Sequence, residues 1–274
     1  MFKSVVPLQA KTHPDLRMVE TNSYGYAARE LIVPVVIDEI ADIAREYAII
    51  FPDNGTHMPG ALLGVETGVN AHVAEDGRWL ATYVPSFIRR YPFALADVTA
   101  QSETPDGQRK FAVVFDPDAP HFKESNGYPV FDAGGAPSEH MKKRLAFLET
   151  LQKRAALTRH LVERLEATDL LIPRSIRISR AGAEDSQLSG LRVVDERKLN
   201  SLGDDDFLAL RKAGVLPLIY AHLLSMANLR QGIIGGRYRI PAAGQAGPKL
   251  AIEDVLDTAT PELDIDWARF EDKN

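Results

Sequence analysis

The sequence contains no cysteine. It therefore forms no disulfide bond, no thiolate zinc site and no cysteine-ligated iron–sulfur cluster, and it carries no thiol nucleophile. Motifs of other catalytic classes are missing too, because there is neither a G-x-S-x-G nucleophile turn nor an H-E-x-x-H zinc motif. No complete catalytic constellation is visible along the chain.

Long apolar runs are also absent. The longest, Leu31–Ile37 and Val215–Tyr220, are far shorter than the roughly 20 residues that a membrane-spanning helix needs. The N-terminal stretch has one lysine but no sustained apolar core, so it does not predict a standard signal peptide. We therefore expect a cytoplasmic protein, with the cell surface as the alternative if export uses no such peptide.

The chain has no surplus of positive charge. Its net charge is −6 and it contains no basic run, so a nucleic-acid partner is not expected. The hydrophobic share of 45% and the charged share of 26% are those of an ordinary soluble globular protein.

Aromatic and arginine side chains, by contrast, are concentrated between Trp79 and Phe93. This stretch, WLATYVPSFIRRYPF, also contains two prolines and the adjacent Arg89 and Arg90. Aromatic residues at that density belong in a core or on a recognition surface. Two neighbouring guanidinium groups are costly to bury unless an anion meets them.

The apolar patterns predict an α+β fold. Short runs rich in branched residues predict strands at Leu16–Val19, Leu31–Val36, Ala48–Phe51, Ala61–Val65 and Phe111–Phe115. Helical spacing predicts a helix over 37–47, a long helix from Ser138 with a candidate break near Leu157–Thr158, and another over Val215–Leu229. Ser175–Ser179 and Leu191–Val194 are typical of a hairpin, and the glycines of Gly232–Gly236 favour the end of a helix.

These elements predict one domain followed by a tail. The domain covers 1–235, with a sheet-rich half over 1–137 packed against a mainly helical half over 138–235. Residues 236–274 are expected to form an Ala/Gly/Pro-rich linker and a loose, acidic tail. The tail carries apolar side chains that are typical of a short docking segment, namely Leu263, Ile265, Trp267 and Phe270.

Several motifs resemble, in the same order, those of the bacterial SapC family. The most specific is Tyr83–Phe93, and the others are Glu46–Phe51, Ala61–Gly64 followed by Asn70, Trp79, Phe131–Gly135 before the long helix, Leu170–Pro173 and Ala213–Asn228. Ala48 stands where the family usually has proline. The resemblance covers roughly residues 10–230, so the tail lies outside it.

The resemblance implies partnership rather than a known reaction. The family takes its name from proteins linked to a bacterial surface layer. Members are often encoded beside flavin-dependent tryptophan halogenases, cupin-like proteins and outer-membrane receptors, which suggests a protein partner from a halogenase or receptor system. No catalytic residues and no cofactor are carried over from the family.

We expect a ligand-binding site in the aromatic–arginine stretch. Guanidinium groups bind carboxylate or phosphate through paired hydrogen bonds, and an aromatic wall would desolvate that contact. The candidate residues are Trp79, Tyr83, Arg89, Arg90, Tyr91 and Phe93. The alternative is structural, with one arginine paired to an internal acid and the other in solvent. On a strand, moreover, the two would point to opposite faces.

Asp116, Asp118 and His121 form a second candidate site just after an apolar strand. The carboxylate oxygens of the two aspartates could hold a hard cation, and the His121 imidazole could act as a general acid or base. His13 and Asp15 have the H-x-D spacing of some iron enzymes. For both motifs an ordinary turn is a sufficient explanation.

Three hypotheses follow. The first is a non-catalytic accessory or binding protein that acts with a partner protein or with a small anionic or peptide ligand. The second is a metal-dependent enzyme, oxygenase-like or hydrolase-like, that uses the Asp and His ligands. The third is a structural protein of the surface layer.

Overall fold

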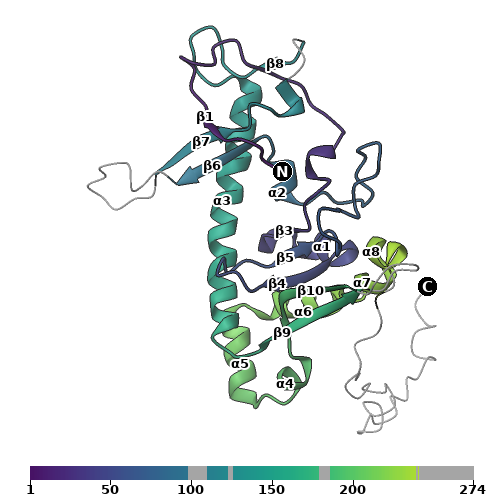
Figure 1. Cartoon of the computed structure of the whole chain (residues 1–274). Coiled ribbons are helices and arrows are strands. Elements are labelled where there is room, and N and C mark those ends of the chain that lie inside the picture. The colour runs from purple at the N-terminus through teal and green to yellow at the C-terminus, as the bar shows by residue number, and fades with distance from the viewer. Residues whose placement is uncertain (98–109, 123–125, 179–185, 239, 241–274) are drawn as a thin grey trace, which may run out of the picture. The chain divides into compact units, whose positions relative to one another are not determined.

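A 28-residue helix, α3 (Glu139–Glu166), is the longest element of the described chain and runs beside two antiparallel sheets (Figure 1). The computed structural model describes residues 1–97, 110–122, 126–178, 186–238 and 240. The helix begins where the sequence predicts, because the Ser138 hydroxyl accepts a hydrogen bond from the Met141 N–H at 3.2 Å. The predicted tail lies outside the described residues from 241 onward.

Beside the first half of α3 lies a three-stranded sheet (Figure 1). Its strand order is β1 (Val6–Pro7), β7 (Phe111–Phe115) and β6 (Phe93–Asp97). A short two-stranded ladder joins β2 (Arg17–Met18) to β8 (Tyr128–Pro129).

The second sheet combines strands from both halves of the chain. Its order is β3 (Ile32–Pro34), β5 (Gly60–Leu62), β4 (Ala48–Pro52), β10 (Ser186–Val194) and β9 (Leu171–Ile178). The predicted hairpin is present as β9 and β10, and it pairs with β4 where Leu191 faces Pro52 and Arg192 faces Phe51. The α+β prediction is confirmed, but the longest strands lie in the half expected to be mainly helical.

The other helices are shorter than α3. They are η1 (Gly25–Ala27), η2 (Ile37–Glu39), α1 (Ile40–Glu46), α2 (Ser86–Arg89), η4 (Pro120–Phe122), α4 (Glu196–Asn200), α5 (Asp204–Ala213), α6 (Leu216–Ser225), α7 (Asn228–Gln231) and α8 (Ile233–Arg237). Helices α1 and α6 pack on β4 of the second sheet, whereas η4 contacts β2. No single helix in the described ranges is long and apolar enough to cross a membrane. Among these residues, one pair of helical segments, Asp204–Ala213 and Leu216–Arg237, reaches the required length and apolar composition when taken together, but the pair is bent by 95°.

One predicted helix boundary is wrong. The candidate break at Leu157–Thr158 does not occur, and the Thr158 hydroxyl donates to the Arg154 carbonyl (2.7 Å) while it accepts the Ile37 N–H (2.9 Å). The glycine-rich segment does end a helix, because Gly232 is the C-cap of α7, but a second short helix, α8, follows at once.

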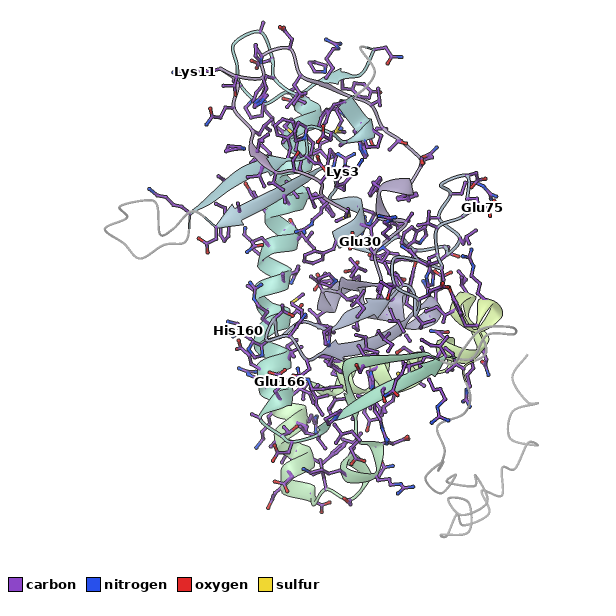
Figure 2. The ribbon with its side chains drawn as sticks, in the orientation of Figure 1. Lys3, Lys11, Glu30, Glu75, His160 and Glu166 are labelled. Carbon is purple, nitrogen blue, oxygen red and sulfur yellow. The ribbon has the colours of Figure 1, made fainter. Side chains whose placement is uncertain are left out.

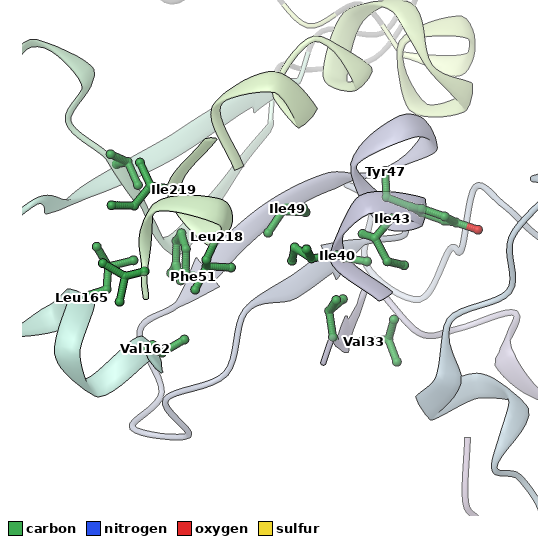
Figure 3. Close-up of a cluster of buried hydrophobic side chains, with 14 of the residues drawn as sticks. Val33, Ile40, Ile43, Tyr47, Ile49, Phe51, Val162, Leu165, Leu218 and Ile219 are labelled. Carbon is green, nitrogen blue, oxygen red and sulfur yellow. The ribbon is translucent and has the colours of Figure 1, made fainter. Parts of the chain in front are cut away.

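The helix α3 contributes to successive parts of the core. Near its start Met141 and Leu148 pack with Phe93 and Phe115 of the three-stranded sheet. Near its end Val162 and Leu165 face the core of the five-stranded sheet, which includes Val33, Ile40, Ile43, Ile49, Phe51, Leu218 and Ile219 (Figure 3). Glu166 closes the helix beside this sheet and pairs with Arg192 of β10 (Figure 2). One helix therefore sets the spacing between the two sheets.

His222 on α6 joins two neighbouring strands. Its Nδ1–H donates to the Ile49 carbonyl of β4 (2.7 Å), and its Nε2 accepts the Val194 N–H of β10 (3.1 Å). The Ser225 hydroxyl accepts the Ile49 N–H at 2.9 Å. His222 is therefore a hydrogen-bonded core residue, and α6 satisfies backbone groups where β4 and β10 separate.

We expect His222→Leu to destabilise the fold by about 3 kcal/mol, because the Ile49 carbonyl and the Val194 N–H lose this partner inside the protein. The measurement is the free energy of unfolding in urea, followed by tryptophan fluorescence. His160→Leu makes the same chemical change at an exposed position of α3 (Figure 2) and should cost no more than about 0.5 kcal/mol. Equal losses in the two variants would contradict the bridging role of His222.

Candidate functional site

The aromatic–arginine stretch adopts a loop, a short helix and a strand in succession. Trp79 to Val84 form the loop, Ser86–Arg89 form α2, and the chain enters β6 at Phe93 after a cis Tyr91–Pro92 bond. The extended backbone assumed for the two arginines is therefore wrong.

The buried carboxylate of Glu39 anchors this stretch to the start of α1. Glu39 is 3% exposed. It accepts hydrogen bonds from the Val36 N–H (3.1 Å), the Tyr83 hydroxyl (2.8 Å) and the Ser86 N–H (2.8 Å). Three donors offset the cost of removing a carboxylate from water. Together they bring the N-terminus of α2 against α1.

A second carboxylate and a tyrosine hold the loop before α2. Glu46 accepts the backbone N–H groups of Thr82 (2.8 Å) and Tyr83 (2.9 Å). Burial acts to raise the pKa of Glu46, but these hydrogen bonds lower it on balance. The Trp79 indole donates to the Tyr47 hydroxyl at 2.8 Å, and that hydroxyl donates to the Tyr83 carbonyl. In the described chain, the contacts of Trp79 are therefore those of a packing residue.

Arg89 is held by neutral acceptors. Its Nε donates to the Val84 carbonyl (2.9 Å), and its Nη2 donates to the Tyr83 hydroxyl (3.0 Å) and the Ser86 hydroxyl (2.9 Å). The guanidinium also lies over the rings of Tyr83 and Phe147, 5.4 and 5.5 Å from their centroids. Within the described ranges no carboxylate pairs with it directly, and the Tyr83 hydroxyl links it to Glu39.

Arg90 has different surroundings. Its guanidinium lies between the rings of Phe87 (4.5 Å) and Phe2 (5.7 Å), and its Nε is buried without a hydrogen-bond partner. Burial lowers the pKa of Arg90. Arg90 lines neither of the two pockets described next.

A pocket of about 260 Å³ lies where α2, α3, η1 and η4 meet. We call it the tyrosine pocket, and its walls include Tyr24, Tyr26, Arg89, Tyr91, His121 and Arg144. A second pocket of about 190 Å³ includes Glu39, Tyr83, Ser86 and Arg154. Arg89 and Phe147 line both pockets, so this guanidinium stands at a shared wall.

The tyrosine pocket carries an excess of positive charge. Arg144 pairs with Glu20, with its Nη2 2.7 and 2.9 Å from the two carboxylate oxygens, and its Nη1 donates to the Arg89 carbonyl at 3.3 Å. Burial, and next the charge of Arg144, lower the pKa of His121 to about 4, so the imidazole is neutral at pH 7. Two arginines against one glutamate leave one positive charge in excess among the side chains that line the pocket.

The six predicted binding residues separate into two groups. Arg89 and Tyr91 line the tyrosine pocket and Tyr83 the second pocket, whereas Phe93 lies in the core, 1% exposed. The sequence did not indicate six residues of the tyrosine pocket, which are Glu20, Thr21, Tyr24, Tyr26, Arg144 and Phe147. Tyr24 and Tyr26 lie two positions apart in the sequence, but no spacing rule connects them with α3.

The predicted metal set is not brought together. The Asp116 carboxylate is occupied by the Lys3 N–H (2.8 Å), the Asp118 N–H (3.1 Å) and the Tyr91 hydroxyl (3.1 Å). His121 faces the tyrosine pocket instead, and no three His, Asp or Glu side chains of the described residues are placed to hold a metal ion. His13 lies edge-on to the ring of Phe115, and Asp15 lies in a turn.

Comparison with known proteins gives one match. The sequence profile of the SapC family matches residues 8–231 of this chain. No curated protein and no solved structure matches it.

The buried histidines make stability depend on pH. Burial lowers the pKa values of His72, His121 and His222 from 6.5 to about 4, so between these values the unfolded chain binds more protons than the folded protein. Their contribution is complete above pH 6.5 and falls as the pH drops towards 4. We expect the free energy of unfolding to fall by about 2 kcal/mol per histidine from pH 7 to pH 5.

This pH dependence is measured by urea unfolding at the two pH values. His222→Leu should remove roughly a third of the loss, while exposed His160→Gln should leave it unchanged. A wild-type stability that is constant over this range would contradict the burial of neutral imidazoles.

Proposed function

The chain belongs to the SapC family, and we propose from the geometry of the tyrosine pocket that it is a non-catalytic binding protein for a small ligand with a carboxylate or phosphate group. The observation that carries the proposal is the fixed orientation of the Arg89 side chain. This side chain is oriented before any ligand arrives, because three neutral acceptors hold Nε and Nη2. A preorganised guanidinium loses little freedom on binding an anion.

Nη1 of Arg89 is the group that supports this role. It has no acceptor among the described residues, whereas Nε and Nη2 are engaged. The rings of Tyr83 and Phe147 lie 5.4 and 5.5 Å from the guanidinium, while Arg89 itself is exposed and therefore open to a ligand. A hydrogen bond from a charged donor to an anion is stronger than one between neutral groups.

Arg144 supplies a second cation from α3. Part of its charge is balanced by Glu20, so the side chains around the pocket suit one negative charge better than several. The volume of about 260 Å³ lies just below the range of pockets for drug-sized ligands. A metabolite-sized monoanion, or the carboxyl terminus of a short peptide, agrees with both properties.

Calorimetric titration with benzoate and with inorganic phosphate tests this proposal. Arg89→Gln should weaken the binding of either anion by roughly tenfold, since it removes the charged donor and keeps a polar side chain. Arg78→Gln makes the same charge change at a side chain that is 72% exposed and outside both pockets, so it should bind as the wild type does.

Circular dichroism of each variant establishes that it is folded. Two outcomes would overturn the proposal. One is a wild-type protein that binds neither anion, and the other is Arg89→Gln binding as tightly as Arg78→Gln.

The family resemblance also supports an accessory role, in which the protein acts with a partner from a halogenase or outer-membrane receptor system. Affinity purification of the tagged full-length chain from its native cells, followed by mass spectrometry, should recover such a partner reproducibly. An unrelated tagged protein of similar charge serves as the control. Recovery of the protein alone would remove the accessory role and leave the ligand-binding proposal in place.

A further inference from the structure

His121 is a polar group of the tyrosine pocket that the protein leaves without a partner. It is 4% exposed, and its Nδ1 is buried with no hydrogen bond. Nε2 has no hydrogen-bond partner among the described residues either. A buried polar atom without a partner is uncommon and costs roughly 1–3 kcal/mol. Here it belongs to a side chain that lines an open pocket.

The chemistry of His121 differs from that of the arginines. As a neutral imidazole it has one N–H donor and one lone-pair acceptor. Such a ring does not attract an anion. It matches a neutral hydroxyl or ring N–H, which can meet Nε2, since Nε2 is not among the buried atoms without a partner as Nδ1 is.

Tyrosine rings surround this imidazole. Tyr26 and Tyr91 stack on each other with centroids 4.3 Å apart and lie 5.6 and 5.4 Å from the His121 ring. The Tyr91 hydroxyl donates to Asp116 at 3.1 Å, and that of Tyr26 is 3.5 Å from the Ile88 carbonyl. Tyr91 is only 2% exposed, so the aromatic surface open to the pocket comes mainly from Tyr24 and Tyr26, which are half-buried and favour contacts with another aromatic ring.

We infer that the ligand of the tyrosine pocket is an aromatic carboxylic acid that also carries a hydroxyl or ring N–H group, and that His121 recognises this second group. The inference rests on the proposed function, because Arg89 and Arg144 hold the carboxylate. Three surfaces of different chemistry then act on one molecule: guanidinium on the carboxylate, tyrosine rings on the aromatic ring, and imidazole on the neutral polar group. His121 determines specificity and takes no part in a reaction.

The test compares four carboxylates by calorimetry at pH 7.5, where His121 is neutral. They are cyclohexanecarboxylate, benzoate, 3-hydroxybenzoate and 4-hydroxybenzoate. The wild type should bind benzoate more tightly than cyclohexanecarboxylate, and at least one hydroxybenzoate roughly tenfold more tightly than benzoate. His121→Phe keeps an aromatic ring and removes the nitrogens, so it should abolish the preference for a hydroxybenzoate over benzoate.

His140→Phe, at an exposed position of α3, is the matched control and should keep both preferences. If His121→Phe does not fold, His121→Gln replaces it, and its retained hydrogen-bonding groups should preserve part of the preference. Equal affinity of the wild type for benzoate and both hydroxybenzoates would overturn the role of His121, and so would an unchanged preference in His121→Phe. Either result, combined with weaker benzoate binding by Arg89→Gln, leaves the proposed function standing. A wild type that binds none of the four carboxylates and no phosphate overturns the proposed function itself.

Discussion

The arrangement of the site depends on one buried carboxylate. Glu39 accepts hydrogen bonds from the Val36 N–H just before η2, from the Tyr83 hydroxyl and from the first N–H of α2. The same hydroxyl and the Ser86 side chain hold the guanidinium of Arg89. A carboxylate in the protein interior must keep its donors, because an unpaired one is very costly. Glu39 therefore links the stability of the fold directly to the orientation of the Arg89 guanidinium.

The helix α3 provides the second constraint. Its first half packs on the three-stranded sheet and its last turns pack in the core of the five-stranded sheet. Arg144 and Phe147 lie in the same turns as Met141 and Leu148, and they reach the pocket that Tyr24 and Tyr26 complete from the N-terminal segment. The pocket thus depends on how the first half of α3 is packed. Its walls come from segments that are more than 100 residues apart in the sequence.

Local patterns predicted much of this architecture. Ser138 was identified as the start of α3 because capping depends on neighbouring residues only. The errors occurred where tertiary contacts override local preference. Thr158 suggested a break in the helix. Its hydroxyl instead accepts a hydrogen bond from the Ile37 N–H while Thr158 stays helical. Asp116 and Asp118 have the spacing of a metal site. Asp116 instead accepts hydrogen bonds from the Lys3 N–H and the Tyr91 hydroxyl.

The sequence by itself determined the family, the α+β class and the importance of the stretch around Arg89, because these depend on the order of motifs and on short-range periodicity. Only the tertiary structure decided which arginine faces a pocket. Arg89 and Arg90 are neighbours with the same side chain, yet one lies at the wall of two pockets and the other between two phenylalanines. The difference arises from the turn of α2 and from the distant residues packed around it, and no local pattern records either.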